Sequence, residues 1–174
     1  LGQCDRAPAA LDEEMKVFDE SKFERAITPN DPDLAINLGG GLHHAYRDSG
    51  MAFCMFNDIA VAIARMRAGG FREPVLVVDL DVHDGNGTRS IFAHDPTVHT
   101  YSIHNEHWGD TTADGSTSIA LGDRVTDEVY LGTLLKTLPD VVDEVRPGLV
   151  VYLAGTDPAA DDPLGNWNVS ADAM

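Results

Sequence analysis

In the stretch PVLVVDLDVHDGNG, residues 74–87, a polar loop follows an apolar run directly. Continuous Val and Leu are typical of a strand buried on both faces, as in a parallel sheet. Carboxylates, an imidazole and glycines follow where that strand should end. This stretch therefore predicts both the class of the fold and the place of the chemistry.

Further apolar runs and helical patterns alternate along the chain. The other apolar runs cover residues 34–38, 98–103 and 149–153. Helical patterns run from an Asn57-Asp58 cap to Gly69-Gly70, and from about Asp127 to Val145. This alternation predicts an α/β fold with a mainly parallel sheet and helices on both of its faces. The sequence contains no internal repeat and no linker, so residues 1–174 are expected to form a single domain.

A polar segment follows each apolar run directly. These segments lie at residues 39–44, 81–87, 104–108 and 155–157. In parallel sheets, active sites lie beyond the carboxyl ends of the strands. We therefore expect all four segments to converge at one edge of the sheet.

Asp79, Asp81 and His83 alternate along the predicted strand end, so their side chains can project to one side. Metal ligation explains this cluster, and so does a group of charges satisfied by backbone donors and an Arg. Asp157, at the end of another predicted strand, favours a metal. Three protein ligands with an open fourth position are typical of catalytic zinc.

Composition limits the partners. The chain has 12 Lys and Arg and 29 Asp and Glu residues. The resulting net charge of −17 argues against direct binding to nucleic acid. The acidic surface either attracts cationic substrates or only maintains solubility. No apolar run can cross a bilayer and no signal peptide is recognisable, so no membrane association is expected. Cys4 and Cys54 are interpreted as reduced thiols of a cytoplasmic protein.

Four segments together resemble motifs of the histone deacetylase superfamily and its bacterial relatives. They are GGGLHHA at residues 39–45, FCMFND at 53–58, VVDLDVH at 77–83, and AGTD at 154–157 continuing to Asp162-Pro163. They occur in the order typical of that family. The resemblance implies an arginase/deacetylase-like fold and a zinc-dependent hydrolase. Its substrate would be the amide of acetyl-lysine or a related acylated amine.

The resemblance also implies a role for each site residue. The implied zinc ligands are Asp81, His83 and Asp157. The implied catalytic residues are His44 as general base, His43 as a second imidazole, Asp79 as the support of His43, and Asn86 as the residue that orients His44. The implied substrate-channel residues are Phe53, Trp108 and Gly41. Asp79 and Ser102, with nearby backbone carbonyls, match the family's potassium site, so Zn²⁺ and K⁺ are the expected cofactors.

The sequence departs from the family pattern in two places. The family carries a donor to the oxyanion, usually Tyr, in a Gly-rich loop past the last metal ligand, and Met174 precedes any such loop. Asp84 stands where a His is common. The resemblance also leaves out the opening segment that borders the pocket rim in full-length members, so we expect the central part of an incomplete deacetylase domain.

Other functions remain open at this stage. A non-catalytic metal-binding fragment or pseudo-enzyme would fit the missing donor loop. An arginase-like ureohydrolase would need a second metal and a further Asp where Gly155 stands, so it ranks lower. A phosphate site at the glycine runs is the weakest hypothesis, because no Gly-Lys-Ser/Thr follows them. Rim loops decide between a protein substrate and a small molecule, so the substrate itself is left open.

Overall fold

The computed structural model describes residues 35–174 of the chain, which divides into two compact units, residues 1–40 and residues 41–174. In the described part of the first unit, residue 35 forms one bridge and residues 38–39 form a turn. The strand expected at 34–38 is therefore not found among the residues described there.

The second unit is built on a four-stranded parallel sheet. Its strands are β1 (Val75–Asp79), β2 (Val98–His104), β3 (Ser116–Ala120) and β4 (Leu149–Leu153), in the spatial order β3-β2-β1-β4. Every residue of β1 is buried, as its unbroken apolar run predicts. Asp79 at the end of β1 pairs with Ser102 on one side and Leu153 on the other. The predicted parallel sheet is confirmed, and β3 is an addition to it.

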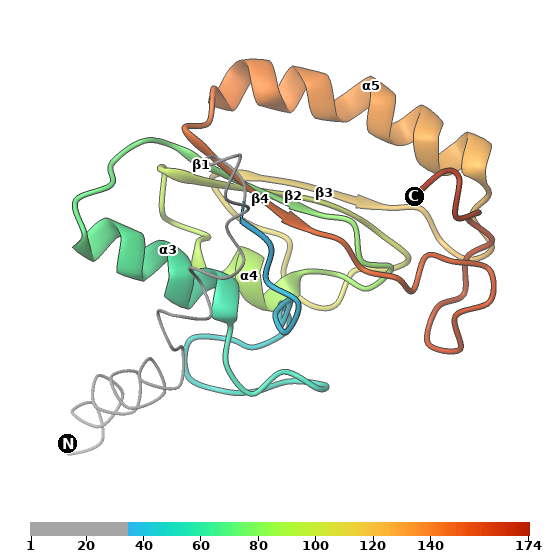
Figure 1. Ribbon diagram of the computed structural model, residues 1–174, viewed down its shortest axis with the longest axis horizontal. Coiled ribbons are helices and arrows are strands. Elements are labelled where there is room, and N and C mark those ends of the chain that lie inside the picture. The colour runs from blue at the N-terminus through green and yellow to red at the C-terminus, as the bar shows by residue number, and fades with distance from the viewer. Residues whose placement is uncertain (1–34) are drawn as a thin grey trace. The chain divides into compact units, whose positions relative to one another are not determined.

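Among the described residues, three helices cover this sheet. They are α3 (Asp58–Ala68), α4 (Asn86–Ile91) and α5 (Asp127–Val145). Asn57 caps α3 by accepting the N–H of Ala60 at 2.9 Å. Figure 1 shows α5 on one side of the sheet and α3 with α4 on the other, so the prediction of helices on both faces is confirmed. None of the described helices is long and apolar enough to cross a membrane.

Alternating strand residues divide the core into two clusters, because successive side chains point to opposite faces of a sheet. The cluster on the α5 side includes Leu76, Val78, Tyr101, Ile103, Tyr130 and Val141. The cluster on the α3 side includes Ile59, Ile63, Val75, Val77, Val98 and Leu153. Burial on both faces fixes the position of β1, and with it the loop that follows Asp79.

Candidate active site

The site lies at the carboxyl ends of β1, β2 and β4, where the predicted polar segments meet. Close backbone packing brings the β4 segment to the β1 segment. A Cβ at Gly155 would lie 2.6 Å from the Cα of Asp81, so only glycine allows this approach without a shift. The prediction that the strand-end segments converge is borne out for these three strands.

The three predicted zinc ligands form one cluster. The Nδ1 of His83 lies 2.7 Å from the Oδ2 of Asp157 and 3.1 Å from the Oδ1 of Asp81. One ligand atom from each residue can be chosen so that all lie within 4.8 Å of one another. Two carboxylates and one imidazole suit Zn²⁺, and three protein ligands leave a position open for water or substrate.

Backbone donors orient both carboxylates of this cluster. The N–H of Val82 donates to the Oδ1 of Asp157 at 2.9 Å, and the N–H of His83 donates to the Oδ1 of Asp81 at 2.8 Å. Because Oδ1 of Asp157 is held in this way, its Oδ2 faces the imidazole. The His83, Asp81 and Asp157 side chains are 22%, 19% and 11% exposed, so solvent reaches the cluster.

The cluster is electrostatically suited to a cation. Hydrogen bonds with Asp157, and then with Asp81, raise the pKa of His83 to about 10. Two carboxylates that stabilise a positive imidazolium this strongly would also stabilise a metal ion bound by the neutral imidazole in place of that proton.

His43 is paired with a carboxylate. Its Nδ1 lies 2.7 Å from the Oδ2 of Asp79, and the two side chains are only 4% and 5% exposed. Burial alone would lower the pKa of His43, but the charge and hydrogen bond of Asp79 outweigh burial and raise this pKa to about 9. His43 is therefore an imidazolium at neutral pH.

His44 is paired with a neutral amide instead. Its Nδ1 lies 2.8 Å from the Oδ1 of Asn86, whose Nδ2 donates to the hydroxyl of Tyr46 at 2.9 Å and to the Sδ of Met51 at 3.2 Å. With the amide oriented in this way, the Nδ1 of His44 must donate, which leaves the lone pair on Nε2. Burial, and then the charge of His43, lower the pKa of His44.

The two imidazoles therefore carry different charges although their ring centroids are only 4.2 Å apart. One is held as a proton donor by Asp79, and the other is kept neutral beside Asn86. Adjacent groups with pKa values driven apart are typical of an acid and a base that work together.

Of the predicted channel residues, Trp108 has the clearest contact with the site. Its indole stacks on His44 with centroids 4.6 Å apart and planes at 14°, and its ring lies 5.3 Å from that of His83. The side chain of Phe53 is 85% exposed. Gly41 has a φ of +93° and donates its N–H to Asp58 at 3.0 Å, which secures the turn that leads to His43.

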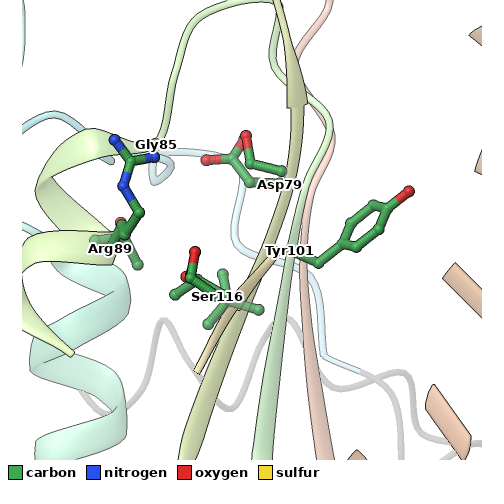
Figure 2. A pocket seen from close by; sticks show the side chains of 9 residues that line it. Asp79, Gly85, Arg89, Tyr101 and Ser116 are labelled. Carbon is green, nitrogen blue, oxygen red and sulfur yellow. The ribbon is translucent and has the colours of Figure 1, made fainter. Parts of the chain in front are cut away.

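The two predicted potassium contacts, Asp79 and Ser102, line one small cavity of about 10 Å³. Figure 2 shows this cavity between α4 and the sheet, with Asp79 and Arg89 on its walls and the Tyr101 ring directed to the other side of the strands. The hydroxyl of Ser102 lies 2.8 Å from the Nδ1 of His104. The structure thus brings both residues to one cavity, and K⁺ binding there stays a prediction.

Sequence reasoning missed several residues that support the site. Asp58 accepts the N–H groups of both Gly41 and Leu42, and Tyr46 orients Asn86. Asp58 already had an ordinary explanation as a helix-start residue. Tyr46 and Asn86 are 40 positions apart in the sequence, and only the fold brings the Tyr46 hydroxyl to the Asn86 amide. No local pattern marks contacts of that kind.

Comparison with known proteins decides the family. A family model described as the histone deacetylase domain matches residues 21–174. This chain belongs to the histone deacetylase family. Among its relatives is an uncharacterised protein of Picosynechococcus sp., 41% identical over 76% of this chain and 44% of that protein. Histone deacetylase B of Dictyostelium discoideum is 34% identical over 79% of this chain and 35% of that protein.

The fold of the histone deacetylase family is found in solved structures too. An HDAC homolog crystallised in complex with SAHA superimposes with a TM-score of 0.72 and 31% identity, over 80% of this chain and 41% of that one. The arginase/deacetylase-like fold expected from the sequence is confirmed. The chain spans less than half the length of each of these three relatives.

Proposed function

We propose that the protein is a zinc-dependent deacetylase that hydrolyses the amide of acetyl-lysine or a related acylated amine. The observation that carries this proposal is a pair of adjacent imidazoles with different partners beside a three-ligand donor set: His43 is bonded to a carboxylate and His44 to a neutral amide. Membership of the histone deacetylase family supports the reaction class.

The residues divide the work of hydrolysis between them. Zinc held by Asp81, His83 and Asp157 would polarise the amide carbonyl and lower the pKa of a bound water. The Nε2 of His44, left free by the bond of Nδ1 to Asn86, accepts the proton of the attacking water. His43, charged beside Asp79, donates a proton to the leaving amine.

Further details belong to the same proposal. Trp108, Phe53 and Gly41 would line the acyl channel, and the oxygens of Asp79 and Ser102 would contact K⁺. The charge of −17 favours an amine-bearing substrate and disfavours direct nucleic-acid contact. A buried, unpaired Cys54 is in keeping with a reducing cytoplasm.

An arginase-like ureohydrolase is disfavoured by packing. A second metal would need a carboxylate at position 155, and even a Cβ there would lie 2.8 Å from the Oδ2 of Asp81. Asp81 already fills the space that a second metal-binding side chain at position 155 would need.

Metal content and hydrolysis, measured together, test the proposed function. The purified chain should bind about one zinc per chain by elemental analysis and release acetate from an acetyl-lysine peptide. Asp81→Ala should lose the zinc. His44→Ala should keep the zinc and lose about 10²- to 10⁴-fold in rate.

His94→Ala and Asp114→Ala are the matched controls, since their side chains are 87% and 72% exposed. Both should keep zinc and rate. Zinc binding without hydrolysis would instead indicate a non-catalytic metal-binding module, and two metals per chain would favour the ureohydrolase. Undiminished hydrolysis in His44→Ala would refute the proposed mechanism.

A further inference from the structure

We propose that a buried ion pair, Asp84 with Arg89, positions the catalytic base His44 by anchoring Trp108 against its ring. This inference rests on the proposed function for the role of His44. The anchoring itself stands on contacts that do not involve catalysis.

The ion pair is fully enclosed. Asp84 follows the predicted ligand His83, and Arg89 lies one turn into α4. Their side chains are 0% and 3% exposed. Both guanidinium Nη atoms of Arg89 donate to Asp84, one of them to Oδ2 at 2.7 Å. A buried pair of charges is retained only when its hydrogen bonds are complete, so this carboxylate has little freedom to move.

The carboxylate of Asp84 is charged as well as fixed. Its two oxygens accept three hydrogen bonds, two from the permanently charged guanidinium of Arg89 and one from the N–H of Trp108. A charged acceptor makes a stronger hydrogen bond with a backbone N–H than a neutral one does.

The same pair holds the loop that follows β2. The N–H of Trp108 donates to the Oδ2 of Asp84 at 2.8 Å, and the Nε of Arg89 donates to the carbonyl of Asp110 at 3.2 Å. Gly109 lies between these two contacts with a φ of +111°, which L side chains rarely adopt. The backbone is therefore secured on both sides of a sharp turn.

Fixing this backbone fixes the indole. Trp108 lies almost flat on His44, with an interplanar angle of 14°. Asn86 holds the Nδ1 edge of the same imidazole, and Trp108 covers a ring face. A single hydrogen bond at the ring edge fixes that edge but lets the imidazole tilt about the bond, whereas a stacked ring prevents tilting out of the ring plane. The two contacts together direct the Nε2 of His44.

A second metal site at this place is disfavoured. Asp84, His104 and His107 bring possible ligand atoms within 4.8 Å of one another. However, Arg89 donates to both oxygens of Asp84, and its permanent positive charge would repel a cation. The cluster is better explained as the anchor of the loop.

Two NMR signals test the anchoring without any need for activity. The chain has two tryptophans, so 5-fluorotryptophan labelling gives two ¹⁹F resonances, assigned with Trp108→Phe. Trp167 is 2% exposed in the core and reports on the overall fold within the same sample. The ring protons of His44, assigned with His44→Ala, report on the stacked indole through its ring current.

The variants are Arg89→Gln and Arg89→Lys. Arg89→Lys keeps the buried charge and should fold, but it loses the planar group that reaches both Asp84 and Asp110. In either folded variant, the Trp108 resonance should move toward its solvent-exposed position and the His44 ring protons should shift downfield, while the Trp167 resonance stays. Arg72→Gln, which removes an exposed Arg bonded only to nearby carbonyls, should change none of them.

A double-mutant cycle tests the effect on the base. Arg89→Gln should reduce kcat about 10- to 100-fold in the wild-type chain, and by less than about twofold in a Trp108→Ala background. Equal losses in both backgrounds would mean that Arg89 acts on stability and not through Trp108. Unmoved Trp108 and His44 signals, or signals that move together with that of Trp167, would overturn the proposal. Full hydrolysis by His44→Ala would end the proposed function and leave the NMR result to decide the anchoring.

Discussion

At the scale of single residues, the site gives two neighbouring histidines opposite properties through their partners. Asp79 raises the pKa of His43 to about 9, whereas burial and the charge of His43 lower the pKa of His44 beside Asn86. The Asn86 amide can accept the Nδ1 proton of His44 only if the amide oxygen faces the imidazole. Tyr46 fixes this orientation, because its hydroxyl accepts a hydrogen bond from the amide nitrogen of Asn86.

Tyr46→Phe should therefore reduce kcat by about two- to tenfold, the effect of losing one hydrogen bond. Zinc content should not change, because Asn86 and His44 lie outside the proposed ligand set. Steady-state hydrolysis of an acetyl-lysine peptide measures the loss. Tyr152→Phe is the matched control, since that side chain is 55% exposed on β4. A loss as large as that of His44→Ala, or no loss at all, would contradict the assigned role of Tyr46.

At the scale of elements, α4 joins the parts of the site although it has only six residues. The N–H of Thr88 donates to the carbonyl of His43 at 3.0 Å, and Asn57 donates to Thr88 at 2.9 Å. The sequence did not reveal this helix, because six residues beginning Asn-Gly-Thr show no helical periodicity. The same is true of β3, whose Ser116–Ala120 run is rich in hydroxyls rather than apolar residues.

Gly87→Ala should disturb the contact between α4 and the histidine loop. A Cβ at Gly87 would meet the backbone of His44 and Ala45, which cannot move aside as a side chain can. We expect a loss of about 1–3 kcal/mol in the free energy of unfolding, together with lower kcat because the His44 backbone shifts. Urea denaturation measures the first effect and steady-state hydrolysis the second.

Gly132→Ala provides the control for this substitution. Gly132 lies inside α5, and apart from the adjacent helix backbone no described atom lies within 4 Å of an added Cβ. Alanine there should stabilise the protein by about 0.5–1 kcal/mol, because glycine loses more backbone entropy in a helix. If both variants were equally stable, the close approach at Gly87 would not constrain the site.

At the scale of the whole molecule, sequence patterns predicted the strands and helices that bury continuous apolar faces. The runs that became β1, β2 and β4 were recognised, as were both ends of α5. The predicted strand at 34–38 had the same appearance, but residues 35–38 contain only one bridge position. Contacts between distant polar groups, such as Arg89 with Trp108 through Asp84, were not foreseen. Their partners are selected by the fold and leave no periodic signal.

The cluster on the α5 side contains one phenol whose ionisation should limit stability in alkali. Tyr130 is 3% exposed, and its ring lies 6.0 Å from that of Trp167. Burial, and then the phenols of Tyr152 and Tyr101, raise the pKa of Tyr130 to about 12. The ordinary pKa is about 10 in an unfolded chain. The contribution of Tyr130 is therefore fully present below about pH 10 and is lost as the pH rises through about 12.

Urea denaturation between pH 9 and about pH 12 should show this loss. The free energy of unfolding should fall by up to about 3 kcal/mol more in the wild-type chain than in Tyr130→Phe, because phenylalanine has no proton to lose. Tyr152→Phe should keep most of the fall, since Tyr152 is half exposed. An equal fall in wild type and Tyr130→Phe would place the alkaline sensitivity elsewhere, and Tyr101 would be the next residue to replace because burial also raises its pKa.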